Sequence, residues 1–227
     1  MDLGKGTLAD LARLRDYKSR RLSSYDRTGG NLDCLMIAPG ACVELGKIGG
    51  AGCVRHIWMT MASLPDEQDE LRQTVLRMFW DGEAHPSVEV PLGDFFGIGF
   101  GLRRNFVSLP LQMSPQDGKS MNCWFPMPFA DGARFEVENQ GTRQRLFYFY
   151  IDYEEHRAAD ADLARFHACW NRTNPTVLCA SSSAVRQSAY GPDFIHGTRY
   201  FSSTHVIPLD VSQSQASVPS RSMASTL

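Results

Sequence analysis

The densest group of chemically versatile side chains lies in the segment Ser23–Asp33, where Asp26, Arg27, Asn31 and Asp33 surround a Gly-Gly pair. The paired glycines let the backbone turn sharply or approach a ligand closely. A planar guanidinium with carboxylate and amide groups can satisfy the vicinal hydroxyls of a sugar, so the segment is a candidate sugar-binding loop. The alternative is a structural turn held by an ion pair of Arg27 with Asp26 or Asp33, and the spacing alone favours that alternative.

A second candidate is a histidine and a tryptophan on one predicted strand. Within Val54–Ala62, alternation places His56 and Trp58 on one face and Arg55 on the other. Such a pair could form a platform for a sugar ring, whereas a core tryptophan beside a hydrogen-bonded histidine is the commoner arrangement.

Glycoside hydrolysis would need two carboxyl groups facing the scissile bond, about 5–5.5 Å apart for retention of configuration and further apart for inversion. Alternation places two pairs of carboxylates on common strand faces, but the sequence does not choose among the candidates. These candidates are Asp26, Asp33, Asp81, Asp94, Glu136, Glu138, Asp152 and Glu154.

Other catalytic signatures do not match. The chain has no Gly-x-Ser-x-Gly elbow and no His-Glu-x-x-His helix, and Leu102 stands where a dinucleotide fingerprint starting at Gly97 needs its third glycine. We interpret Phe95–Gly101 as a flexible loop packed by its phenylalanines. The six cysteines show no zinc spacing and are expected to be reduced and mostly buried, so we expect neither a metal nor another cofactor.

The elements that would position these residues are short strands. Runs rich in β-branched and aromatic residues alternate with Gly, Asp and Asn turn signals, and about eight of them fall between residues 34 and 153. This pattern predicts an all-β jelly-roll sandwich, with one short helix over Leu8–Arg15 and another over Asp160–Trp170. The predicted strands are Leu35–Ala38, Cys42–Ile48, Val54–Ala62, Thr74–Trp80, Ser87–Leu92, Cys123–Phe129, Ala133–Glu138 and Arg145–Tyr153.

The overall composition excludes several classes of protein. The 227 residues include 23 basic and 25 acidic ones, and the pI is near 6.3, which is far from the basic character of a typical nucleic-acid binder. The uncharged stretches are too short for a membrane span, and the N-terminus leads into charged residues rather than a signal core. We therefore expect a cytoplasmic protein that binds neither nucleic acid nor membrane.

The composition changes sharply near residue 175. The last 53 residues contain only five charged side chains, no Lys and no Glu, but twelve serines. Such a break is typical of a linker, a disordered tail, or sequence foreign to the preceding domain.

Several long motifs, in order, closely resemble the domain of unknown function family 2961, now placed in glycoside hydrolase family 172. The resemblance covers roughly residues 7–176 and is carried by Ser23–Asn31, Val54–Thr60, Trp80–Phe96, Asn122–Phe129, Glu136–Gly141 and Tyr148–Glu154. It implies two consecutive jelly rolls that assemble into homotrimers or larger oligomers, and a retaining enzyme acting on α-linked fructofuranosides or D-arabinofuranosides. From the polar segment and the predicted strand described above, we take Asp26, Arg27 and Asn31, followed by Asp33 and Trp58, as the candidate substrate contacts.

The resemblance ends after Thr176, and the family's two catalytic glutamates lie beyond that point, in the second jelly roll. This chain has no Glu after Glu155, so neither can be matched and we expect the chain to be inactive. We divide it into an N-terminal helical segment (1–19), a jelly roll (20–155), a connection (156–176) and a divergent Ser-rich tail (177–227), which we attribute to truncation or a frameshift. The alternative function is a non-catalytic carbohydrate-binding or assembly module.

Overall fold

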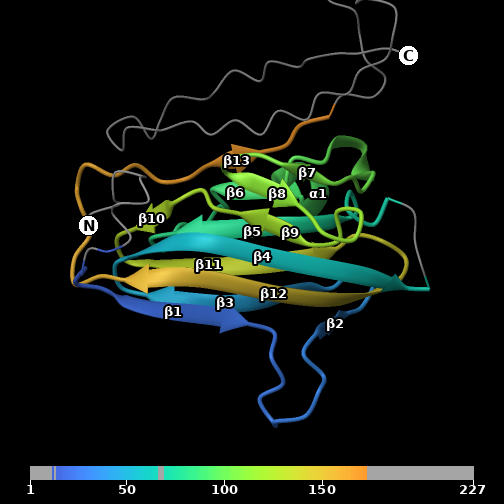
Figure 1. Ribbon diagram of the computed structural model, residues 1–227, viewed down its shortest axis with the longest axis horizontal. Helices are drawn as coiled ribbons and strands as arrows, with labels where there is room; N and C mark the ends of the chain where they lie inside the picture. The colour runs from blue at the N-terminus through green and yellow to red at the C-terminus, as the bar shows by residue number, and fades with distance from the viewer. Residues whose placement is uncertain (1–11, 13, 66–68, 173–227) are drawn as a thin grey trace, which may run out of the picture.

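The chain folds as a sandwich of two β-sheets, seen in the computed structural model of the protein, which describes residues 12, 14–65 and 69–172 (Figure 1). The eight-stranded sheet runs in the order β1 (Lys18–Ser23), β12 (Gln144–Glu155), β4 (Gly52–Leu64), β9 (Met121–Cys123), β8 (Leu111–Met113) and β7 (Phe106–Val107), with β2 (Leu35–Ile37) on β12 and β10 (Met127–Phe129) on β4. The five-stranded sheet runs in the order β13 (Ala168–Cys169), β6 (Val88–Pro91), β5 (Thr74–Trp80), β11 (Gly132–Asn139) and β3 (Cys42–Gly49).

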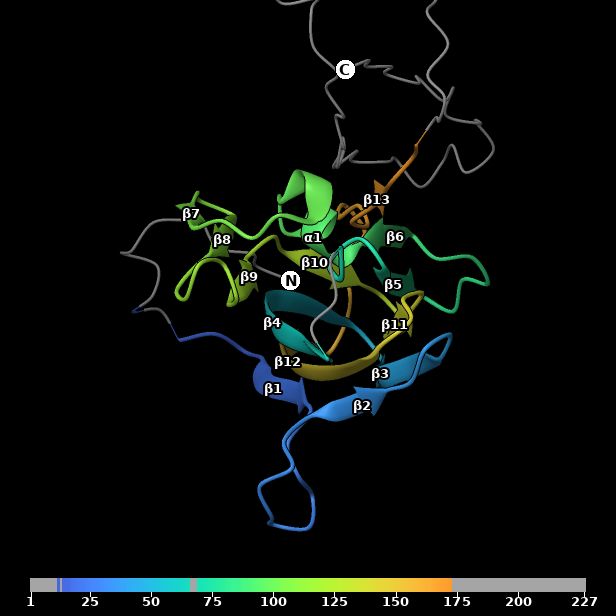
Figure 2. The ribbon, with the colours of Figure 1, turned by 90° about the vertical axis from the view of Figure 1, so that its right-hand side faces the viewer.

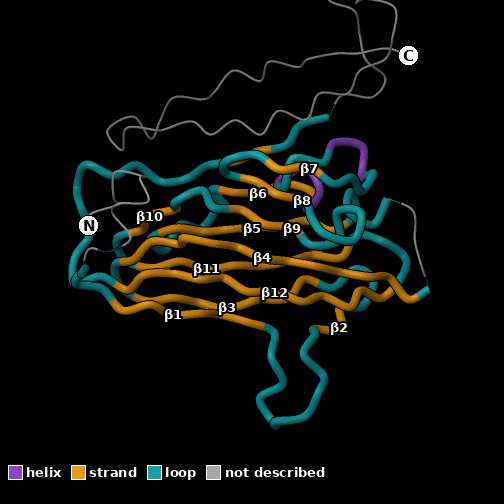
Figure 3. The backbone as a smooth tube through the Cα atoms, in the orientation of Figure 1, coloured by secondary structure: helices purple, strands orange, loops and turns teal. Residues whose placement is uncertain are grey.

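Helical structure is confined to a small part of the described chain (Figure 3). It comprises α1 (Leu92–Phe95) and the 3-10 turn η2 (Gly99–Gly101), which interrupt the loop expected over Phe95–Gly101. The expected packing of that loop holds for Phe95 and Phe96, which are buried, whereas Phe100 is exposed. In the described part of the chain, no helix has the length and apolar character needed to cross a lipid bilayer. The prediction of an all-β jelly-roll sandwich is confirmed.

Alternation along the two longest strands builds the core. Every second side chain of β4 and β12 faces the other sheet and is excluded from water, while the residues between them face outward. The inward set includes Ile57, Met59, Met61, Phe147, Phe149 and Ile151, and it packs with Leu76, Met78, Trp80, Phe135 and Val137 of the smaller sheet in one cluster.

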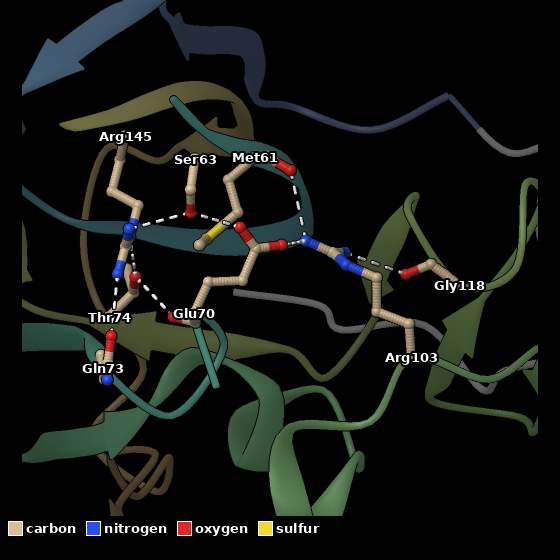
Figure 4. Close-up of polar contacts among 8 residues, drawn as sticks. All are labelled: Met61, Ser63, Glu70, Gln73, Thr74, Arg103, Gly118 and Arg145. Carbon is tan, nitrogen blue, oxygen red and sulfur yellow. Dashed lines mark hydrogen bonds and ion pairs between the residues drawn. The ribbon is translucent and has the colours of Figure 1, made fainter. Parts of the chain in front are cut away.

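A buried arginine also ties the two layers together (Figure 4). Arg145 of β12 is fully buried and donates hydrogen bonds to Ser63 Oγ (2.8 Å) and to Gln73 Oε1 (3.2 Å), just before β5. Ser63 in turn donates to Glu70 (2.5 Å), and the other carboxylate oxygen of Glu70 accepts from Arg103 (2.5 Å). This chain of contacts links the eight-stranded sheet to β5 and to the segment that leads into β7.

The short helix predicted over Asp160–Trp170 is wrong. The segment forms a turn at Ala161 and Asp162, continues without helix and leads into β13, which pairs in parallel with β6. It is held by specific contacts: Arg165 Nε donates to Asp81 Oδ2 (2.5 Å), and Trp80 Nε1 donates to the carbonyl oxygen of Phe166 (2.7 Å). These contacts with the sandwich outweigh the local helical pattern.

Two other predictions concern the ends of the chain. The helix predicted over Leu8–Arg15 falls mostly outside the described residues, and so does the Ser-rich tail 177–227.

Of the cysteines, Cys34, Cys53 and Cys123 are buried free thiols, as expected, whereas Cys42 and Cys169 are exposed free thiols.

Candidate functional site

The polar segment singled out from the sequence forms a loop, residues 24–33, that projects from the sandwich between β1 and β2 (Figure 2). Asp26 organises this loop. Its Oδ1 accepts hydrogen bonds from the backbone N–H (2.9 Å) and the hydroxyl (2.6 Å) of Thr28, and its Oδ2 accepts from the N–H of Leu32 (3.2 Å). These hydrogen bonds lower the pKa of Asp26, so the carboxylate stays ionised at neutral pH.

The base of the loop is held by Asp33 and Ser24. Asp33 Oδ1 accepts from the backbone N–H of Asp26 (2.8 Å), and Ser24 Oγ donates to the backbone oxygen of Asp33 (2.7 Å) while accepting from the N–H of Phe149 (3.1 Å). Gly30 completes the turn, because a Cβ there would lie 2.5 Å from Asp26 Oδ2. Asp26 and Asp33 therefore shape the loop.

The same loop presents Arg27 and Asn31 to solvent. The Arg27 guanidinium lies over the Tyr25 ring, 5.1 Å from its centroid, and its Nη1 is 3.5 Å from the Tyr25 hydroxyl. The carboxylate of Asp26 is engaged by Thr28 and Leu32 instead. The structural turn considered from the sequence thus exists, but Asp26 and Asp33 accept hydrogen bonds from backbone N–H groups and the Thr28 hydroxyl instead of forming the expected Asp–Arg pair, and Arg27 is exposed.

Trp58 lies away from this loop, on the outer face of the eight-stranded sheet. There it belongs to a group of side chains that we call the outer-face cluster, formed by β1, β4, β12, β9 and the residues flanking β9. Its members are Arg21, His56, Trp58, Ser120, Asn122, Trp124, Tyr150 and Asp152. The loop adjoins the cluster, because Ser23, the last residue of β1, pairs with Tyr150, which pairs on its other side with Trp58.

Hydrogen bonds connect the polar members of the cluster. Arg21 donates twice to Asp152, from Nε to Oδ1 (2.6 Å) and from Nη2 to Oδ2 (3.1 Å), and His56 Nδ1 lies 3.1 Å from the same Oδ2. His56 Nε2 lies 3.2 Å from Asn122 Oδ1. Asn122 Nδ2 then donates to Ser120 Oγ (3.2 Å).

The rings of the cluster pack against one another. Trp58 Nε1 donates to Ser120 Oγ (2.9 Å), and the Trp58 ring lies 4.9 Å from that of Tyr150. His56 stacks on Trp124, with centroids 5.2 Å apart and planes 19° apart. The cluster is therefore an ordered surface of aromatic faces and hydrogen-bonded polar groups.

A β-bulge shapes one end of this surface. The register between β12 and β4 passes from Asp152↔His56 to Tyr153↔Val54 and skips Arg55. Alternation predicted that Arg55 and His56 lie on opposite faces of the strand, but the bulge interrupts the alternation here. Arg55 forms an ion pair with Glu154 (3.4 Å).

The candidate carboxylates all have cationic or N–H partners. Besides Asp26 and Asp33, the pairs are Asp81 with Arg165, Asp94 with Arg72, Glu136 with Arg134, Glu138 with Arg77, Asp152 with Arg21, and Glu154 with Arg55. At Asp81, burial raises the pKa, but hydrogen bonds from Asp131, Arg165 and Ala130 outweigh it and hold the pKa below its ordinary value. A general acid needs the opposite shift, and at Asp26, Asp81 and Asp152 the pKa is lowered.

Sequence reasoning missed most of the outer-face cluster. Arg21 lies in a charged strand without apolar alternation, and Trp124 follows a strand of only three residues. The available signal was the shared face of His56, Trp58, Tyr150 and Asp152, which alternation gives once β4 and β12 are known to pair.

Comparison with protein-family models places the chain in a known family of domains. A family model described as GH172 domain-like matches residues 31–148, more than half of the chain. The matched region includes Asn31, Asp33 and Trp58 and begins after Asp26 and Arg27. No curated protein matches the chain.

Proposed function

The chain belongs to the GH172 domain-like family, and from this premise we propose that its sandwich binds α-linked furanosides through the 24–33 loop without hydrolysing them. The proposal depends on one observation about the loop. Asp26 and Asp33 hold its backbone in place, while the side chains of Arg27 and Asn31 are exposed to solvent. A preformed loop loses little conformational entropy on binding, and exposed guanidinium and amide groups suit sugar hydroxyls.

The absence of turnover is proposed from two observations. No Glu follows Glu155, so the residues that the family resemblance would make acid/base and nucleophile have no counterpart in these 227 residues. Three of the candidate carboxylates, Asp26, Asp81 and Asp152, have a lowered pKa because of their hydrogen bonds, which favours the ionised form rather than a proton donor.

The test uses the 227-residue chain with aryl α-D-arabinofuranoside and α-fructofuranoside. We expect binding by calorimetry and no release of the aryl group.

Arg27→Ala should weaken binding by about tenfold, since a charge-assisted hydrogen bond to the sugar is lost. The exposed Arg143→Ala, remote in sequence from the loop, is the matched control and should leave affinity unchanged. Turnover that disappears on mutation of Asp26 or Asp33 would refute the claim of inactivity, and an Arg27→Ala variant with normal affinity would refute the assignment of the loop.

The second candidate function is a non-catalytic module for assembly, in which the sandwich forms a homo-oligomer of three or more chains. The exposed rings of the outer-face cluster favour it, because such residues are enriched at protein interfaces. Sedimentation, together with the calorimetry above, distinguishes the two candidate functions. A stable oligomer that does not bind furanosides supports assembly, whereas a chain that binds furanosides supports the first proposal.

A further inference from the structure

The outer-face cluster offers aromatic rings to solvent next to the proposed furanoside loop. Trp124 is 40% exposed and Tyr150 38% exposed, although both rings are partly covered by neighbours. Large aromatic residues left this open on a sheet face supply binding energy when a ligand covers them.

The cluster is rigid before any ligand arrives. Trp58 is held by its indole N–H bond to Ser120, and Trp124 is stacked on His56, whose two ring nitrogens contact Asp152 and Asn122. A ligand would therefore meet rings that are already oriented, so little side-chain entropy is lost on binding.

The charge of the cluster selects the class of ligand. Arg21 and Asp152 neutralise each other through a bidentate pair, and the Arg21 guanidinium also lies 4.4 Å from the centroid of the Tyr150 ring. A surface without net charge gives a polyanion no electrostatic gain. Polar groups separate the rings, which disfavours the continuous apolar core of an obligate protein interface.

Mixed aromatic and hydrogen-bonding surfaces of this kind suit neutral carbohydrate, whose rings have apolar faces and hydroxyl rims. We propose that the outer-face cluster binds the further units of a neutral furanoside oligosaccharide whose first unit occupies the 24–33 loop. This inference rests on the proposed function for its ligand class. The chain of sugars would run from β1 across β12 and β4 toward β9, which spans about 14 Å for three strand spacings and exceeds one sugar ring.

The experiment is calorimetric titration of the 227-residue chain with α-linked arabinofuranose oligosaccharides of increasing length. We expect affinity to rise from one unit to four. Trp124→Ala should cost about tenfold in affinity for the tetramer and nothing for the monomer, because only longer chains reach its ring. Trp124→Phe should retain most of the affinity, since it preserves a ring at that position.

Two controls make the result specific. Phe100→Ala removes another exposed aromatic ring, one in η2 outside the cluster, and should leave both affinities unchanged. Unfolding curves of each variant show whether the sandwich is intact. If Trp124→Ala is unfolded, the test is instead whether the affinities of the wild type and of Trp124→Phe rise with the length of the oligosaccharide.

The outcomes separate the two proposals. If affinity does not depend on length, or if Trp124→Ala binds the tetramer normally, the cluster is not a sugar platform, while loss of monomer binding in Arg27→Ala still supports the loop. If no oligosaccharide binds and sedimentation shows that Trp124→Ala dissociates an oligomer, the cluster is a self-association surface and the inference is overturned.

Discussion

At the scale of single residues, Asp152 is the centre of the outer-face cluster, and its role can be tested by pH. Burial raises its pKa, but hydrogen bonds and charges from Arg21 and His56 outweigh that effect and hold the pKa below its usual value. Because the pKa of Asp152 is lower in the folded state, ionised Asp152 stabilises the fold at any pH above its unfolded pKa of about 3.9. This stabilisation is lost as the pH falls through the pKa of the folded state.

We therefore expect Asp152→Asn to lower the free energy of unfolding by about 1 kcal/mol at pH 7, a modest cost because both partners are partly exposed. The difference from wild type should shrink toward zero as the pH falls below about 4. Denaturant unfolding between pH 7 and pH 3 measures it, with the exposed Asp162→Asn as the control. A difference that stays constant over this range would show that the ionised pair is not its source.

Residue types identified the loop but not the role of each member. Sequence reasoning placed Asp26, Arg27, Asn31 and Asp33 together correctly, because they are neighbours in the chain. It could not tell that the two carboxylates bind backbone N–H groups while Arg27 points outward, since that depends on the path of the loop. Side chains far apart in sequence, such as Trp124 with His56, meet only after the strands pair.

At the scale of the elements, the long strands with apolar alternation were predictable, whereas the single strand predicted over Cys123–Phe129 is in fact two short strands, β9 and β10. β1 (Lys18–Ser23) reads as a charged segment, yet it pairs along its whole length with β12, and Arg21 also forms an ion pair with Asp152 of that strand. The segment before β13 has a local pattern that predicts a helix, but its contacts with Asp81 and Trp80 outweigh that pattern.

The network around Arg145 connects elements of both sheets through buried polar contacts (Figure 4). Arg145→Leu should destabilise the sandwich by about 3–5 kcal/mol, because the buried partners Ser63 and Thr74 lose their donor. Arg145→Lys should not restore stability, since an ammonium cannot make the same set of directed bonds. The exposed Arg143→Leu is the control, and its unfolding midpoint in denaturant should stay within experimental error of wild type. Equal midpoints for Arg145→Leu and Arg143→Leu would contradict the role assigned to the network.

At the scale of the whole molecule, the described strand pairings of both sheets lie between residues 18 and 169. The composition break near residue 175 follows them closely. The segment 156–172 contributes to the sandwich, because Phe166 is 5% exposed and packs in the core, and β13 extends the smaller sheet.

We expect a fragment of residues 1–176 to unfold cooperatively, with the same denaturant midpoint as the 227-residue chain. A fragment of residues 1–156 should lose several kcal/mol, because it lacks the buried Phe166 ring, its hydrogen bond from Trp80 and the Arg165 partner of Asp81. Near-UV circular dichroism during denaturation reports the packing of the aromatic side chains, Trp80 among them. If the 1–176 fragment were as unstable as the 1–156 fragment, residues beyond 176 would belong to the folded unit, and the boundary inferred from composition would be wrong. Equal stability of all three chains would instead show that Arg165 and Phe166 contribute little to holding the sheets together.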